Sequence, residues 1–289
     1  MKLTSPTNVR SILEQLKLSP IKARSQNFLI DQNILDIIIS TAELKPSDCV
    51  LEIGPGLGVV TEELLGKVRH VIAVEIDHGL SAYLQDRFAA AENLQLICGD
   101  VLDIDLAALP EAGQRKVVAN LPYSVASRVL VNFAEAVTPP PVIVVTIQRE
   151  VADRLVAPPG NKDYGALTIW LQAAYEVSVR KVVSPGCFWP RPGVDSAVIK
   201  MVRRPDDALD LKDRQLFHSL VKHSFTHRRK QLATILSRMP GFAETPPAEW
   251  RKVLGPLSLD SCARPENLSV GDWCRLANAL TAQLSAKAL

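Results

Sequence analysis

From Cys49 onward, short and strongly apolar segments alternate with amphipathic segments, and this alternation leaves few possible folds. Five segments are almost continuously apolar, as strands buried on both faces of a parallel sheet are: CVLEIG, HVIAVEI, LQLICGD, KVVANL and PVIVVTI. The stretches between them, such as VTEELLGKV and GLSAYLQDRFAA, carry apolar residues at helical spacing. The pattern predicts an open α/β sheet with right-handed crossover connections.

Two more strand-like segments, AYEVSVRKVV and AVIKMVRR, are expected to close the sheet as a hairpin-like pair. The run Pro205-Asp206-Asp207 then breaks the pattern, and the remaining chain has helical periodicity only. We therefore predict a basic helical lead-in over residues 1–24, an α/β domain over residues 25–205 and a small all-α domain over residues 206–289.

Composition excludes several classes of protein. The chain has 289 residues, enough for a sizeable core, and no run of about eighteen apolar residues that would span a membrane. The N-terminus lacks the apolar core of a secretory signal; a transit segment is the alternative, but Glu14 and the amphipathic spacing favour a short helix. The five cysteines form no C-x-x-C pair, which indicates reduced thiols in the cytoplasm. The net charge of +2 is too small to indicate which kind of partner the protein binds.

A glycine-rich turn, VLEIGPGLGVVTEELL, follows the first apolar segment and precedes a predicted helix. Gly54, Gly56 and Gly58 let the backbone bend tightly and let a ligand approach. The spacing G-x-G-x-G after Glu52 differs from the dinucleotide pattern G-x-G-x-x-G, and no P-loop lysine follows, so a pyrophosphate is not expected. A turn without any ligand is the alternative.

Acidic residues end the next two apolar segments. Glu75 closes VIAVE, where its carboxylate can accept hydrogen bonds from two ribose hydroxyls, and Asp100 closes LICGD, within reach of an adenine amine. Each could be a solvated acid at a strand end. Because successive parallel strands end at the same edge of a sheet, Glu52, Glu75 and Asp100 together indicate an adenosine-bearing cofactor without phosphates.

The fourth apolar segment ends in Asn120-Leu121-Pro122-Tyr123. The side-chain oxygen of Asn120 and the carbonyl of Leu121, held by the fixed dihedral of Pro122, offer two acceptors that converge on one point. An exocyclic aromatic amine has two N–H donors for such a pair, and its lone pair would then face an electrophile. Tyr123 would stack on the base. An ordinary Asn-Pro-containing turn with a packed tyrosine is the alternative.

Taken together, these motifs resemble the ribosomal RNA adenine N6,N6-dimethyltransferase family, and within it the bacterial small-subunit (16S) enzymes. The resemblance covers nearly the whole chain, through SQNFL, LEIGPGLGVVTEEL, VEID, GDVL, NLPY, QREVADRL, YGALT, FWPRPGVDSAVIKM and SFTHRRKQL in that order. It implies a class I S-adenosylmethionine-dependent methyltransferase fold, Rossmann-like with a mostly parallel seven-stranded sheet, followed by an all-α domain. Ser25 and Ser124 depart from the usual residues of the family.

The resemblance also implies roles for individual residues. Contacts to S-adenosylmethionine are expected from Asn27, Leu29, Gly54, Gly56, Glu75, Ile76, Asp100, Val101 and Asn120. The catalytic set would be Asn120, Leu121, Pro122, Tyr123 and Phe188. Phe188, in the loop CFWPRPGVDS, could close over the target base opposite Tyr123, or it could be packed core; the resemblance favours the active site.

The segment from Arg214 to Arg238 carries six Arg or Lys, three His and no acid, with Phe217 and Phe225 interleaved. Phosphate and stacking contacts to RNA are both available there, and a solvated helix face is the alternative. We expect RNA contacts from Lys22, Arg24, Lys222, Arg228, Arg229 and Lys230. His223 and His227 are spaced as metal ligands, but no third ligand follows, so no metal is expected.

By resemblance, the expected function is S-adenosylmethionine-dependent N6,N6-dimethylation of two adjacent adenosines in the 3′-terminal hairpin of 16S rRNA, with S-adenosylhomocysteine as the second product. The expected partner is the pre-30S or 30S small subunit. The enzyme itself is expected to be a cytoplasmic monomer that does not bind a membrane. One alternative is a large-subunit (23S) dimethyltransferase of the macrolide-resistance type. The other is a non-catalytic assembly or RNA-binding factor. The long lead-in before Gln26 and the FWPRPGVDSAV block favour the small-subunit enzyme.

Overall fold

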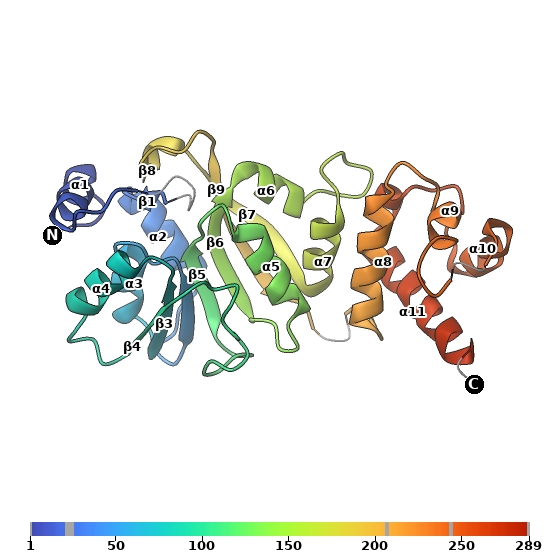
Figure 1. Ribbon diagram of the computed structural model, residues 1–289, viewed down its shortest axis with the longest axis horizontal. Helices are drawn as coiled ribbons and strands as arrows, with labels where there is room; N and C mark the ends of the chain where they lie inside the picture. The colour runs from blue at the N-terminus through green and yellow to red at the C-terminus, as the bar shows by residue number, and fades with distance from the viewer. Residues whose placement is uncertain (1, 21–25, 206–207, 243–244, 288–289) are drawn as a thin grey trace. The chain divides into compact units, whose positions relative to one another are not determined.

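The computed structural model describes the chain except residues 1, 21–25, 206–207, 243–244 and 288–289 (Figure 1). Contacts within the chain divide it into two compact units. The first comprises residues 1–152 and 176–203, and the second comprises residues 153–175 and 204–289.

A seven-stranded sheet forms the centre of the first unit, in the order β4-β3-β2-β5-β6-β9-β7. Its strands are β2 (Cys49–Ile53), β3 (His70–Glu75), β4 (Leu94–Cys98), β5 (Lys116–Asn120), β6 (Val142–Gln148), β7 (Tyr175–Val183) and β9 (Ser196–Arg203). The strands from β4 to β6 pair in parallel, and β9 pairs with β6 in antiparallel register. The predicted mostly parallel seven-stranded sheet is confirmed.

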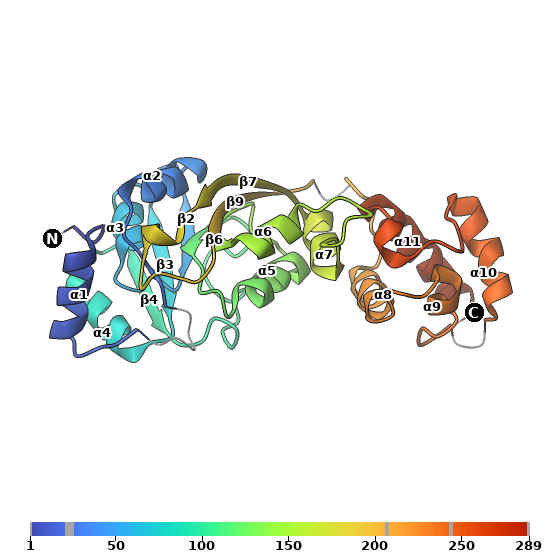
Figure 2. The ribbon, with the colours of Figure 1, turned by 90° about the horizontal axis from the view of Figure 1, so that it is seen from above.

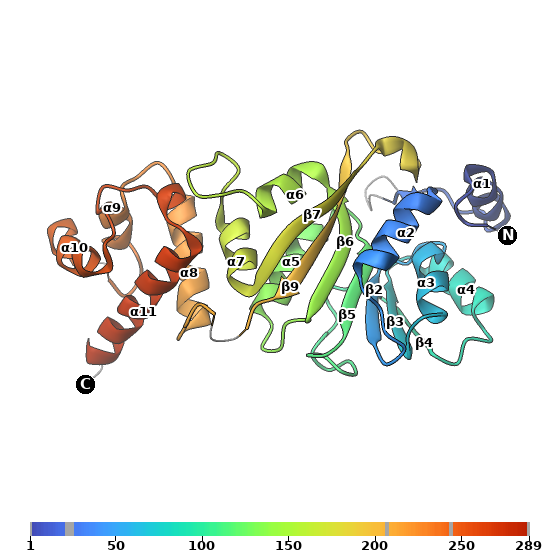
Figure 3. The ribbon, with the colours of Figure 1, turned by 180° about the vertical axis from the view of Figure 1, so that it is seen from behind.

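Helices cover both faces of this sheet. They are α2 (Gln32–Thr41), α3 (Val59–Leu65), α4 (His78–Arg87), α5 (Ala126–Glu135) and the start of α6 (Arg149–Leu155). The apolar faces of α2 and α3 pack with valines of the sheet into one hydrophobic core. In Figure 1 α5 lies in front of the strands, and in Figure 3, seen from behind, α2 does. Four of the five apolar segments are thus buried between helical layers, as their composition predicts, whereas β4, at the edge of the sheet, is only partly buried.

A small two-stranded sheet joins distant parts of the first unit. β1 (Phe28–Leu29) pairs in antiparallel register with β8 (Phe188–Trp189), which follows a short 3-10 turn at Pro185–Cys187. Beside it lies α1 (Pro6–Gln15) (Figure 2). The apolar face of α1 packs in one buried cluster with Phe28 and Leu57. The lead-in expected over residues 1–24 is therefore packed onto the first unit where it is described.

The second unit is helical. It contains α7 (Ala166–Ala174), α8 (Arg214–Thr226), α9 (Leu232–Leu236), α10 (Pro247–Leu254), α11 (Val270–Lys287) and 3-10 turns at Gly255–Leu257 and Pro265–Asn267. Its core gathers Phe217, Trp250 and Trp273, all buried. The Tyr164 hydroxyl donates to the carbonyl of Leu268 at 2.8 Å, which ties the α7 side of this core to the segment before α11.

This division differs from the single boundary expected near residue 205. Residues 153–175 precede β9 in the chain, yet Tyr164 and Ile169 are fully buried in the helical core. Their apolar side chains need a partner, and α7 finds it in α8 and α11. No helix among the described residues is long and apolar enough to cross a membrane.

Candidate active site

A cavity of about 290 Å³ lies in the first unit, where the parallel strands end. Such a position is the usual ligand site of open α/β sheets. Its lining includes every predicted cofactor residue and the predicted Asn-Leu-Pro-Tyr turn: Asn27, Leu29, Gly54, Gly56, Glu75, Ile76, Asp100, Val101, Asn120, Leu121, Pro122 and Tyr123. Ser124, one of the two departures, also lines it and is exposed. Ser25, the other, lies outside the described residues.

The glycine turn between β2 and α3 is shaped by left-handed backbone. Gly54, Gly56 and Gly58 have φ of +68°, +61° and +85°, which residues with a side chain rarely adopt. A Cβ atom on Gly54 would also lie 2.9 Å from Cγ of Pro122. The glycine turn and the Asn-Leu-Pro-Tyr turn thus approach each other so closely that only glycine fits at their contact.

Glu75, at the end of β3, is held by the backbone around it. Its Oε2 accepts from the N–H of Gly56 at 3.0 Å, and its Oε1 accepts from the N–H of Asp77 at 2.9 Å. The side chain is only 3% exposed, and burial raises the pKa of its carboxyl. Each carboxylate oxygen has a second lone pair, so Glu75 can still accept hydrogen bonds from two vicinal hydroxyls.

Glu52 is a further acid of the pocket; the sequence counts it among the three strand-end acids but predicts no contact for it. It is 1% exposed, and its Oε2 accepts from the hydroxyl of Thr61 in α3 at 2.7 Å. Burial, aided by the nearby charge of Glu75, raises the pKa of Glu52 to about 8. The sequence shows that Glu52 precedes the glycine turn. It does not show that the helices packed on the sheet bury the carboxyl group.

The far end of the pocket combines a carboxylate with apolar side chains. One oxygen of Asp100 accepts from the N–H of Leu102 at 2.9 Å, which fixes the orientation of the carboxylate. Ile76 is exposed and Val101 is buried, and both line the pocket. A flat heterocycle with an exocyclic amine suits this combination of apolar walls and an acceptor at the edge.

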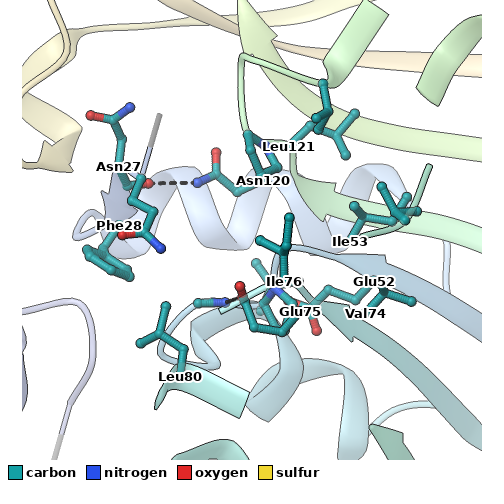
Figure 4. A pocket seen from close by; sticks show the side chains of 18 of the residues that line it. Asn27, Phe28, Glu52, Ile53, Val74, Glu75, Ile76, Leu80, Asn120 and Leu121 are labelled. Atoms are coloured by element: carbon teal, nitrogen blue, oxygen red, sulfur yellow. Dashed lines mark hydrogen bonds between the residues drawn. The ribbon is translucent and has the colours of Figure 1, made fainter. Parts of the chain in front are cut away.

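Asn120 presents a buried acceptor at the end of β5. Its Nδ2 donates to the backbone carbonyl of Asn27 at 3.0 Å (Figure 4). Because a carbonyl can only accept, this bond settles which end of the amide is nitrogen. The Oδ1 atom is buried and has no hydrogen-bond partner within the described part of the chain. A buried acceptor left open in a pocket wall fits a donor from a ligand.

Tyr123 is half-buried, and its hydroxyl is hydrogen-bonded to the hydroxyl of Ser196 at 2.5 Å. Burial raises the pKa of the Tyr123 phenol, so the hydroxyl stays protonated at neutral pH. The ring lines the pocket beside Asn120, where the expected stacking role needs it.

Phe188 is placed differently from its expected catalytic role. It is 2% exposed and packs in the core with Leu29 and the apolar face of α2, and it is not part of the pocket lining. The β1–β8 pairing sets Phe188 opposite Leu29 and turns its ring inward. Of the two interpretations of this residue, packed core describes the structure.

The N-terminal segment, through α1 and the residues before it, contributes to the pocket in a way that the sequence did not reveal. Leu3 and Val9 are buried side chains of the pocket lining. The guanidinium of Arg10 lies 5.5 Å from the ring centroid of Trp189 in β8. Amphipathic spacing indicated a helix here, but it carried no signal for where that helix docks.

The expected RNA-contacting residues divide into two kinds. Lys222, Arg229 and Lys230 are exposed on the second unit. Arg228 instead donates to the carbonyls of Lys162 at 2.9 Å and Asn161 at 3.3 Å, and its Nε lies 3.4 Å from Glu266. Its guanidinium therefore holds a loop of the protein, and its contact to phosphate stays a prediction. Lys22 and Arg24 lie outside the described residues.

His223 and His227 have ring centroids 4.9 Å apart. In the described ranges no three His, Cys, Asp or Glu side chains come together as metal ligands would.

Comparison with known proteins identifies the family to which a chain with this pocket belongs. Residues 21–281 match the family described as "Ribosomal RNA adenine dimethylase". Curated relatives named "Ribosomal RNA small subunit methyltransferase A" include those of Alkaliphilus metalliredigens, 38% identical over 98% of this chain and 99% of the relative, and Geobacillus kaustophilus, 39% identical over 96% and 97%.

Solved structures agree with this grouping. A dimethyladenosine transferase from Plasmodium falciparum has a TM-score of 0.76 and 26% identity, over 88% of this chain and 98% of that one. The 23S rRNA methyltransferase ErmE has a TM-score of 0.65 and 28% identity, over 88% and 100%.

Proposed function

The chain belongs to the ribosomal RNA adenine dimethylase family, and on that premise we propose that it transfers two methyl groups from S-adenosylmethionine to the N6 atom of adenosine in small-subunit rRNA. The observation that carries the proposal is the buried Oδ1 of Asn120 in the wall of the pocket, for which the described residues offer no hydrogen-bond partner. Its neighbours Glu75 and Asp100 suit the ribose and adenine of a nucleoside cofactor.

The residues present fit S-adenosylmethionine. Glu75 would accept the ribose hydroxyls, and Asp100 would accept the adenine amine between the side chains of Ile76 and Val101. The glycine turn lets the backbone approach the cofactor, and Asn27 and Leu29 close the pocket from the N-terminal side. When bound, the cofactor supplies a methyl group on a positively charged sulfur.

The chain itself positions the amine that receives the methyl group. Oδ1 of Asn120 and the carbonyl of Leu121 accept the two N–H groups of the target amine, and Pro122 restricts the backbone between them and Tyr123. Tyr123 stacks on the base. Positioning and exclusion of water supply most of the acceleration, so no side chain needs to act as a general base.

We further propose that the substrate is a pair of adjacent adenosines in the 3′-terminal hairpin of 16S rRNA, met in the pre-30S or 30S subunit by a cytoplasmic monomer. The names of the curated relatives support the small subunit. Exposed Lys222, Arg229 and Lys230 would contact phosphates, and Lys22 and Arg24 remain candidates for the same role.

The large-subunit alternative has the likeness to ErmE in its favour, at lower identity than the small-subunit relatives. One experiment separates the two. The protein is incubated with methyl-labelled cofactor and either undermethylated small subunits or 23S rRNA, and the modified bases are mapped. Label at N6 of small-subunit adenosines supports the proposal. Label only in 23S rRNA supports the alternative, and no label in either supports a non-catalytic factor.

A further inference from the structure

The hydrogen bond between Tyr123 and Ser196 joins two parts of the first unit that are far apart in sequence. Tyr123 lies in the turn after β5, and Ser196 is the first residue of β9, 73 positions later. The two oxygen atoms are 2.5 Å apart, and Ser196 is 0% exposed. A hydroxyl in so closed a site needs a partner, and Tyr123 provides it.

Sheet topology brings Ser196 to the edge where the pocket lies. β5 and β6 run in parallel and end there, and β9 is antiparallel to β6, so it begins where they end. The register pairs Ser196 with Gln148, the last residue of β6. An antiparallel strand is thus able to deliver its first side chain beside the carboxyl ends of its neighbours.

Further bonds fix the position of Ser196. The N–H of Arg149 donates to the carbonyl of Asp195 at 2.9 Å, and its Nη1 donates to the carboxylate of Asp195 at 3.2 Å. Ser196 is therefore held by strand pairing and by the residue before it. Its hydroxyl is a rigid point of attachment for a side chain that extends from a loop.

Tyr123 needs such a point because its own backbone lies outside regular structure. The backbone end of the residue is restrained by Pro122, whose carbonyl accepts from Val125 and Ala126 at 3.2 Å. The bond to Ser196 restrains the other end of the ring. A ring restrained at both ends has already lost its rotamer freedom, so a stacked base does not have to order it.

Resting on the proposed function, we propose that Ser196 is a positioning residue for methyl transfer: its hydroxyl holds the Tyr123 ring where the target adenine stacks. Ser196 is not among the residues that line the pocket. This gives the FWPRPGVDS loop a role at the active site through its last residue, although Phe188 is buried in the core.

A double-mutant cycle tests the proposal. Ser196→Ala and Tyr123→Phe each remove one hydroxyl of the pair, and the double variant removes both. Methyl transfer to undermethylated small subunits is measured at saturating cofactor and subunit. Each single variant is expected to lower kcat about 3- to 10-fold, as loss of one hydrogen bond does, with an unchanged KM for the cofactor. The double variant should be no slower than the slower single variant.

Ser178→Ala is the matched control, since Ser178 lies in β7 of the same sheet and its hydroxyl donates to the carbonyl of Lys200 at 3.3 Å. It should keep the wild-type kcat. Wild-type kcat in Ser196→Ala, or a double variant slowed by the product of the two single effects, overturns the inference. If Ser196→Ala fails to fold, Tyr123→Phe decides alone, because a wild-type rate in that variant also overturns it. Wild-type protein that methylates no adenosine contradicts the proposed function itself.

Discussion

Glu52 is a carboxyl group enclosed by the protein, and its environment makes the stability of the fold depend on pH. Its pKa is raised from the usual value of 4.5 to about 8, chiefly by burial. The folded protein therefore holds a proton on Glu52 at pH values where the unfolded chain has lost it. The stabilisation is fully present below about pH 4.5 and is lost as pH rises to about 8.

Glu52→Gln should flatten this dependence, because glutamine keeps an oxygen for the Thr61 hydroxyl and does not ionise. Between pH 5 and 8 the free energy of unfolding of the wild type should fall by up to ~1.4 kcal/mol per pH unit on account of Glu52. Denaturant unfolding at several pH values measures it. Exposed Glu92→Gln is the control and should keep the wild-type slope. An unchanged slope in Glu52→Gln would contradict the buried-acid account.

Single residues also show where sequence reasoning succeeds. Glu75, Asp100 and Asn120 are predicted to face one site because each ends a parallel strand, and the fold brings all three to one pocket. The burial of Glu52 and the role of Ser196 are not predicted. A strand-end position is visible in the local pattern, whereas the burial of Glu52 and the partner of Ser196 depend on segments remote in the chain.

At the scale of elements, two turns form the functional centre of the first unit. The β2–α3 turn passes so close to the β5–α5 turn that a Cβ atom on Gly54 would lie 2.9 Å from Pro122. The φ of +68° at Gly54 adds strain for any side chain. The distance between the two turns in the pocket therefore depends on the absence of a side chain at Gly54.

Gly54→Ala should push the two turns apart, with a cost of about 1–3 kcal/mol in stability from the left-handed backbone alone. Cofactor affinity should fall at least about tenfold for the same energetic reason. Gly66→Ala is the control, since Gly66 ends α3 with a φ of −81° and a Cβ atom there would meet nothing within 4 Å beyond its own helix and chain neighbours. Calorimetric titration with S-adenosylhomocysteine measures the affinity, and a wild-type dissociation constant in Gly54→Ala would refute the close-approach argument.

Elements differ in how far the sequence predicts them. The buried strands follow from runs of apolar residues, which are a local property. β1 and β8 are only two residues long and become strands by pairing with each other across the chain. That pairing buries Phe188, so its expected catalytic role could not be judged from its own loop. The docking of α1 beside the pocket is non-local for the same reason.

At the scale of the whole molecule, chain order and spatial units do not coincide. Residues 153–175 leave the sheet unit, join the helical core and return to the sheet in β7. The predicted boundary at Pro205 marks only the second of these passages. The first lies close to Pro158-Pro159-Gly160, but a helix and a further strand-like segment follow these residues, so the sequence alone presents them as a loop within one domain.

The second unit carries the exposed cations expected to contact RNA. Arg229→Ala with Lys230→Ala should weaken binding to small subunits and lower the slope of log K against log salt by about 2, one for each lost phosphate contact. Cofactor affinity should stay at the wild-type value, since the cofactor pocket lies within the first unit. Binding is measured by filter retention across a salt series.

Arg251→Ala is the matched control, because Arg251 is exposed on α10 of the same unit outside the basic segment. It should leave the salt slope unchanged. Equal slopes in the double variant and the wild type would remove Arg229 and Lys230 from the RNA surface.

In the proposed mechanism, the buried oxygen of Asn120 positions the target amine for methyl transfer. Single-turnover methylation of undermethylated small subunits by Asn120→Ala at saturating S-adenosylmethionine, with cofactor binding measured on the same protein, tests this role. We predict that transfer falls at least about 100-fold, as on loss of a positioned transition-state group, while cofactor affinity is weakened only modestly. Transfer at the wild-type rate would contradict the account.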